Sequence, residues 1–176
     1  MNYLYHVVPE NLRGDVLLPL HKLAEIHPDL AKEAARKYEG REHLMQVRIP
    51  ILNCRWNDAL HLTPLHPSKT RCALEEAGLP TRPLTFFRIP PSALSESHTV
   101  HFSNAADTQS RYDFPPSSFT PFNPMTYEEL PSVPPAQSAY FAQMKLQNQR
   151  PLLWSRTPHV FHHGSLPVRS LDIIAW

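Results

Sequence analysis

Proline is the residue that most constrains how this chain can fold. The 176 residues include 20 prolines and only 4 glycines. Because proline lacks a backbone N–H and fixes φ, it excludes long uninterrupted helices over most of the chain and favours short strands joined by rigid turns. The scarcity of glycine disfavours the glycine-rich phosphate loops of P-loop and dinucleotide-binding proteins, and neither fingerprint occurs in the sequence.

Length and composition indicate one globular domain, residues 1–176. A chain of this length can bury one core but is short for two domains, and 41% of its residues are hydrophobic. The net charge of +1 gives no general attraction to nucleic acid. Five basic residues leave a local patch open: Arg36, Lys37, Arg41, Arg48 and Arg55.

The sequence also bears on the compartment. It contains no apolar run of about 18 residues, so we expect no contact with a membrane. The N-terminus lacks the pattern of a signal peptide, and only two cysteines occur. We therefore expect a cytoplasmic protein with free thiols.

Apolar periodicity predicts short strands and helices in an α+β arrangement. Strands are predicted at residues 3–8, 43–52, 57–67, 84–90, 99–103, 151–155, 159–163 and 171–176. Helices are predicted at residues 9–26, 28–40, 67–80 and 136–149. Between residues 110 and 135, prolines alternate with aromatic residues. A disordered linker seldom holds so many aromatics, so we expect an ordered loop segment that lies over the body of the domain.

His6 and Asn11 stand at the two ends of the predicted corner between the first strand and the first helix. A histidine beside a helix start can donate to a ribose hydroxyl, and the helix end favours phosphate. The alternative is a partly buried histidine bonded to the backbone. Arg41 and Arg48 flank the start of the next strand, and an arginine fork is the usual partner of a pyrophosphate, although solvated arginines are commoner.

The stretch WNDALHLTPLHP places polar residues around two leucines. In a strand, Asn57, His61 and Thr63 would share one face and form a cleft wall, with Asp58 on the other face; the alternative is an edge strand with a wet face.

Several histidines raise a metal hypothesis: His61, His66, His159, His162 and His163. No HExxH pattern or cysteine pair supports it, and we expect no metal. The sequence patterns of catalytic serine and cysteine nucleophiles are absent as well.

The opening LYHVVPENLRGDVL resembles the start of the ADP-ribosyltransferase superfamily, in particular the DarT type that modifies DNA bases. That type begins with a strand ending in Tyr-His-Ile-Thr, and an Asn-Leu helix start follows. Four residues fit this pattern: Tyr5, His6, Asn11 and Leu12. An arginine and a further strand come next in the family, at positions comparable to Arg41 or Arg48 and residues 57–67. A later segment, HFSNAADTQSRYDF, is similar to the family's TDGNAAS segment through Asn104, Ala105 and Ala106.

The resemblance implies a split, twisted, mixed or antiparallel sheet core with a cleft for NAD. His6 would hold the ribose and nicotinamide side, Asn11 would support the cofactor, and Arg41 or Arg48 would contact the diphosphate. The expected cofactor-binding residues are Tyr5, His6, Asn11, Arg41, Arg48, Asn57 and Thr63. The expected catalytic residues are His6, Arg41, Asp58 and His61. The implied reaction transfers ADP-ribose from NAD to a nucleic acid or protein acceptor, as in toxin-like members.

One departure from the family leaves the reaction open. Where the family has a catalytic glutamate after its last helix, this chain has Pro151 and Leu152. Three outcomes follow. Asp58 takes the place of the glutamate; the chemistry follows that of the related RNA 2′-phosphotransferases, which use histidine and arginine; or the domain binds a nucleotide without catalysis.

Overall fold

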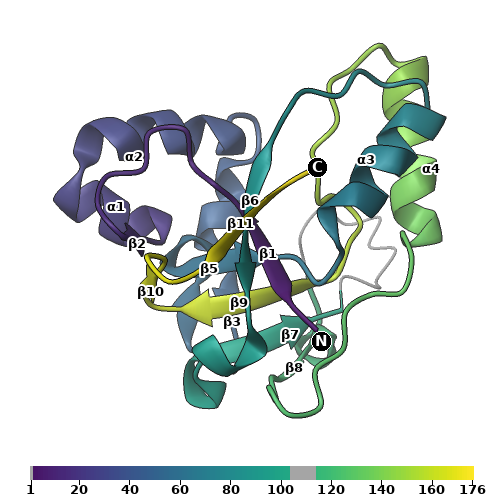
Figure 1. Ribbon diagram of the computed structural model, residues 1–176. Helices are drawn as coiled ribbons and strands as arrows, with labels where there is room; N and C mark the ends of the chain where they lie inside the picture. The colour runs from purple at the N-terminus through teal and green to yellow at the C-terminus, as the bar shows by residue number, and fades with distance from the viewer. Residues whose placement is uncertain (1, 104–113) are drawn as a thin grey trace.

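Two antiparallel sheets form the centre of the computed structural model, which describes residues 2–103 and 114–176 (Figure 1). The first sheet has the order β1-β6-β11, made of Leu4–Val7, Thr85–Ile89 and Asp172–Ala175. The second has the order β5-β9-β7-β8, made of Ala59–Leu62, His159–His163, Thr99–Phe102 and Phe119–Pro121. Two small ladders pair β2 (Val16–Leu17) with β10 (Leu166–Pro167) and β3 (Arg48–Ile49) with β4 (Cys54–Arg55).

The two sheets meet where β1 passes the end of β5. The N–H of Tyr5 donates to the carbonyl of Thr63 at 3.0 Å, and the N–H of Thr63 donates to the carbonyl of Tyr5 at 2.9 Å. Because side chains alternate along a strand, Tyr5 and His6 point to opposite faces of the first sheet. This single bridge therefore sets where the side chains of β1 and β5 can meet.

Prolines begin each of the four α-helices found in the described residues. Helix α1 (Leu20–Ile26) follows Pro19, and proline is the first residue of α2 (Pro28–Ala35), α3 (Pro67–Glu76) and α4 (Pro135–Leu146). The first helical position suits proline because its N–H would have no partner there. Short 3-10 helices connect the elements: η1 (Arg36–Tyr38), η2 (Glu42–Gln46), η3 (Trp56–Asp58), η4 (Pro91–Ala93), η5 (Glu96–His98) and η6 (Pro116–Ser118). In Figure 1, α1 and α2 lie to one side of the sheets, and α3 packs beside α4 on the other.

The core consists of three groups of side chains. One contains residues of both sheets, among them Leu4, Ile89, Leu60, Leu62 and Val160. The second is largely aromatic and is built on the second sheet, with Trp56, Phe102, Phe119 and Phe161. The third lies between α3 and α4, with Leu74 and Phe141.

The expectation of one α+β domain with antiparallel sheets and short helices is confirmed. No helix of the described residues is long and apolar enough to cross a membrane.

The prediction of one helix over residues 9–26 is wrong. The stretch forms β2 and then α1, because Pro19 has no N–H to continue a helix and lies immediately before α1. The strand predicted over residues 43–52 is also wrong for most of its length. Residues 42–46 form η2, and β3 keeps only two residues before a turn at Asn53, whose φ is +46°.

The strand predicted over residues 151–155 is wrong as well. Its backbone bonds to side chains of α4 instead of to a neighbouring strand. The N–H of Leu152 donates to the hydroxyl of Tyr140 at 3.0 Å, and the carbonyl of Leu153 accepts from Gln137 at 2.7 Å. Because these side chains satisfy the backbone groups, the segment needs no ladder.

The described part of the proline- and phenylalanine-rich segment packs on the body of the domain. Phe119 and Phe122 are buried, and the N–H of Leu130 donates to the carbonyl of Pro64 at 2.9 Å. Among the large hydrophobic side chains described in this segment, Met125 is the exposed one, with 87% of its surface accessible. Residues 110–113 and the matching trio Asn104, Ala105 and Ala106 lie outside the described residues.

Candidate functional site

His6 and His61, from the two different sheets, come together at the junction of β1 and β5. The charge of Lys37 lowers the pKa of both imidazoles, and His6 and His159 also act on His61. His61 therefore lies within electrostatic reach of the other three side chains, and its ring centre is 6.3 Å from that of His159. We call His6, His61, His159 and Lys37 the histidine cluster. All three imidazoles are half-buried.

Each imidazole of the cluster is held by a backbone carbonyl. His6 Nδ1 donates to Val7 at 2.6 Å, and His159 Nδ1 donates to Thr157 at 2.7 Å. His61 Nε2 donates to Trp56 at 2.8 Å. A carbonyl oxygen can only accept, so each of these nitrogens carries the proton. In the neutral imidazole the opposite nitrogen is then an acceptor: Nε2 of His6 and His159, and Nδ1 of His61.

Burial keeps these imidazoles neutral. It is the largest cause that lowers the pKa of His6 from 6.5 to about 4, against an opposing contribution from the Val7 carbonyl. Burial likewise lowers the pKa of His159 to about 4 and that of His61 well below 6.5. At neutral pH the cluster therefore presents three unprotonated nitrogens beside one lysine.

Lys37 and its neighbour Arg41 supply positive charge at one end of the histidine cluster. The guanidinium of Arg41 donates to the carbonyl of Lys37. Although Lys37 as a whole is exposed, burial around its ammonium is the largest cause that lowers its pKa, and the charge of Arg41 is the second. The ammonium also lies 5.2 Å from the ring centre of Tyr38. Two cations held close together gain from an anion placed between them.

Aromatic rings orient His61 and His159. The ring centres of Trp56 and His61 are 5.2 Å apart in an edge-to-face contact. His159 stacks on Phe161 with centres 5.7 Å apart, and His61 meets His159 edge-on at 6.3 Å. His61 and His159 share one face of the second sheet because His61 pairs with Phe161, two residues from His159.

The structure places three further predicted site residues away from the histidine cluster. The hydroxyl of Tyr5 donates to Glu129 at 3.0 Å, on the opposite face of β1 from His6. The hydroxyl of Thr63 accepts the N–H of Leu65 at 3.2 Å.

Asn11 is exposed, and its amide donates to Glu33 at 3.2 Å. These polar atoms therefore already have partners within the protein.

Arg48, Asn57 and Asp58 have local partners or belong to a different element from the one predicted. Arg48 donates to the side chain of Asn53 at 2.6 Å. Asn57 and Asp58 belong to η3, so the strand-face assignment made for Asn57 does not hold. The Asp58 carboxylate caps η3 by accepting the N–H of Arg55 at 2.8 Å. Of the predicted site residues, the structure thus brings together His6, His61 and Arg41.

Sequence reasoning missed the roles of two cluster residues. Lys37 was visible only as one of five basic residues, and His159 only as part of a histidine-rich strand. His159 lies two residues before Phe161, and Phe161 pairs with His61. His159 could therefore be assigned to the same sheet face as His61 only after the strand pairing was known. Among residues 2–103 and 114–176, no group of three or more His, Cys, Asp or Glu side chains is placed to hold a metal ion.

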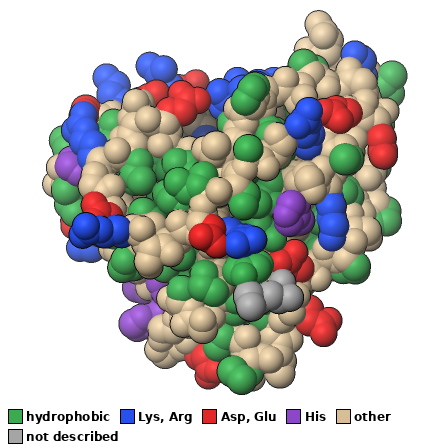
Figure 2. All heavy atoms as spheres, viewed as in Figure 1, with side chains coloured by type: hydrophobic (Ala, Val, Ile, Leu, Met, Phe, Trp, Pro, Cys, Tyr) green, Lys and Arg blue, Asp and Glu red, His purple; other side chains and the backbone are tan. Residues whose placement is uncertain are grey.

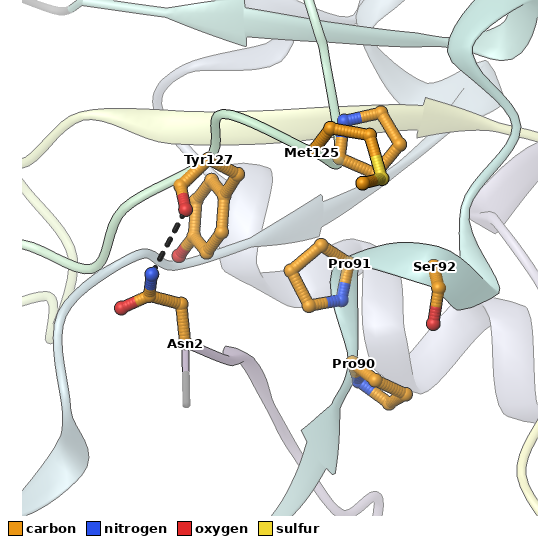
Figure 3. Close-up of a pocket in the computed structure, with 7 residues that line it drawn as sticks. Asn2, Pro90, Pro91, Ser92, Met125 and Tyr127 are labelled. Carbon is orange, nitrogen blue, oxygen red and sulfur yellow. Dashed lines mark hydrogen bonds between the residues drawn. The ribbon is translucent and has the colours of Figure 1, made fainter.

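Two surface depressions lie elsewhere and contain no residue of the histidine cluster. The one in Figure 3, of about 290 Å³, is walled by Tyr127, Met125 and three prolines; the Asn2 amide donates to the Tyr127 carbonyl there at 3.0 Å. The other, of about 440 Å³, includes Arg88, which pairs with Asp172. On the face in Figure 2, basic and acidic side chains are interspersed, without one extended basic patch.

Neither depression is lined by a histidine or a lysine, so the histidine cluster is the better candidate for chemistry. Comparison with family models, with curated proteins and with solved structures found no match to this chain.

Proposed function

We propose that the chain is an ADP-ribosyltransferase-like enzyme that binds NAD at the histidine cluster and modifies a nucleic acid or protein acceptor. The observation that carries this proposal is the meeting of His6 from the first sheet and His61 from the second beside Lys37 and Arg41. The resemblance of the N-terminal stretch supports it, because the family implies NAD at that strand.

The cluster suits a ligand that is anionic at one end and rich in hydroxyl groups at the other. Lys37 and Arg41 supply the positive charge for a diphosphate. The free nitrogens of His6 and His61 are acceptors, so they can bind ribose hydroxyls. A nucleotide with a ribose joined to phosphates offers both groups at once. Binding in this way would place the glycosidic bond of NAD close to the two imidazoles.

A second candidate is an activity like that of the RNA 2′-phosphotransferases. One observation favours it: within residues 2–103 and 114–176, no carboxylate is among the groups that shift the pKa of His6, His61 or His159. Imidazoles and cations without a neighbouring carboxylate would not repel the 2′-phosphate of an RNA substrate. Binding of a nucleotide without catalysis remains the alternative if NAD binds and is not consumed.

Two measurements test the proposal. NAD binding is followed by the shift in melting temperature, and turnover is followed by release of nicotinamide. The Lys37→Met variant should bind NAD at least tenfold more weakly, because a hydrogen bond to a charged group contributes about 1.5–3 kcal/mol. The matched control is Arg48→Met, which removes a cation that bonds to Asn53 outside the cluster.

The outcomes separate the candidates. Equal losses in the Lys37 and Arg48 variants would place the anion site elsewhere. If NAD causes no shift in melting temperature and no nicotinamide is released, the proposal fails. Nicotinamide release only when an RNA with an internal 2′-phosphate is added would favour the second candidate.

A further inference from the structure

The histidine cluster has a cationic end and a neutral end, and His159 lies at the neutral one. Lys37 acts on the pKa of His6 and of His61. His159 lies next to His61, with ring centres 6.3 Å apart, and its pKa is lowered by burial and then by the neighbouring His101 imidazole, with no contribution from Lys37. A diphosphate held by Lys37 and Arg41 therefore leaves the His159 end for an uncharged group.

The ring of His159 is fixed on three sides. Its Nδ1–H donates to the carbonyl of Thr157, it stacks on Phe161, and it lies across the strand from Phe102, whose ring centre is 6.3 Å away. With Nδ1 protonated, Nε2 holds the lone pair. An imidazole in a fixed tautomer and orientation is prepared to accept a proton from a group that approaches Nε2.

We propose that His159 binds the acceptor of the transfer reaction and receives its proton at Nε2. This inference depends on the proposed function. In the step, the bond between the ribose C1′ and the nicotinamide nitrogen breaks, and its electron pair leaves with neutral nicotinamide. A new bond forms between C1′ and the acceptor atom. The proton of that atom passes to His159 Nε2 and then to solvent.

The same geometry defines the class of acceptor. An acceptor that meets a lone pair on Nε2 must bring a hydrogen, as a hydroxyl or a neutral amine does. A phosphate dianion has no proton to give, and its oxygens would face the lone pair without a hydrogen bond between them. His159 thus selects hydroxyl or amine acceptors over phosphorylated ones.

The test uses NAD in water and in water containing methanol, so that both acceptors carry a hydroxyl. The measured products are nicotinamide, ADP-ribose and the methyl riboside of ADP-ribose. In His159→Gln, formation of both transfer products should fall about 100-fold or more, which is the usual contribution of a positioned base. The affinity for NAD, from the shift in melting temperature, should stay within about threefold, since the phosphates bind at the other end.

His162→Gln is the matched control. His162 is on the same strand but faces the opposite side of the sheet, where its Nδ1 bonds to Thr99 at 2.9 Å. This variant should transfer at the wild-type rate. Added imidazole should restore part of the activity to His159→Gly and none to His61→Gly, since only the first variant lacks just the proton acceptor.

Each contrary result identifies what is wrong. Transfer by His159→Gln within about threefold of wild type would overturn the assignment of the base. If His159→Gln lost both its affinity for NAD and its transfer activity, the assignment of the base would also be overturned, because His159 would then hold NAD. If wild-type protein binds no NAD, or binds NAD and releases no nicotinamide, the proposed function fails at binding or at turnover, and this inference fails with it.

Discussion

Acid should unfold this protein through its buried neutral histidines. Burial lowers the pKa of His6, His159 and His162 from 6.5 to about 4 in each case. One pKa unit corresponds to about 1.4 kcal/mol, so protonating one such histidine in the folded state costs about 3 kcal/mol relative to the unfolded chain. Three of them together approach the whole stability of a typical domain, about 5–15 kcal/mol.

The direction follows from proton binding. Between pH 6.5 and pH 4 the unfolded chain binds a proton at each histidine and the folded protein does not. The contribution to stability is therefore complete above pH 6.5 and is lost as the pH falls toward 4. At pH 5 each histidine should have lowered the free energy of unfolding by about 2 kcal/mol relative to pH 7.

His162 is the best residue for isolating this effect. It is 7% exposed and lies outside the histidine cluster. Glutamine at this position has an N–H that can donate to Thr99 but does not titrate. In urea denaturation, the drop in unfolding free energy between pH 7 and pH 5 should be about 2 kcal/mol smaller in His162→Gln than in wild type. An equal drop in wild type and His162→Gln would refute the reasoning.

Three further predictions concern stability and reactivity. Glu129→Ala should lower the free energy of unfolding by about 1–3 kcal/mol, because it leaves the buried hydroxyl of Tyr5 without its acceptor. The loss should be smaller in a Tyr5→Phe background, and an equal loss there would show that this hydrogen bond contributes nothing. Cys72 is exposed, whereas burial raises the pKa of Cys54 to about 11, so a thiol reagent should modify one cysteine quickly and the second only on unfolding; fast modification of both would contradict the burial of Cys54. Gly78 follows α3 with φ of +69°, so Gly78→Ala should lower the melting temperature at a cost of about 1 kcal/mol, and no change would show that the turn relaxes.

Much of the secondary structure could be predicted from local signals. The strand His159–His163 and the helix Pro135–Leu146 follow from apolar periodicity and from proline at a helix start. The wrong strand over residues 151–155 has a clear cause, because its backbone groups form hydrogen bonds that the local sequence pattern does not show. Residues 151–155 alternate as a strand would, but side chains of α4 satisfy their backbone.

The sequence could predict only those site residues that the pattern of a single strand identifies. His6 was visible from its place on the first strand, and His61 from its place on a polar strand. Which residues stand beside them depends on the pairing of β5 with β9 and on the position of η1, and neither is encoded in a short window. Arg48 and Arg41 looked equivalent in the sequence. The structure separates them, because Arg48 bonds to Asn53 in a turn while Arg41 bonds back to Lys37.

The tautomers of the histidine cluster connect the fold to its proposed chemistry. Three imidazoles from three parts of the chain each donate to a backbone carbonyl, so the carbonyls, and not a ligand, decide which nitrogen is free. Each of these bonds leaves the opposite nitrogen of its imidazole as an acceptor. Three neighbouring acceptor nitrogens beside a lysine are groups to which one ligand with several hydroxyl groups and a negative charge could bind.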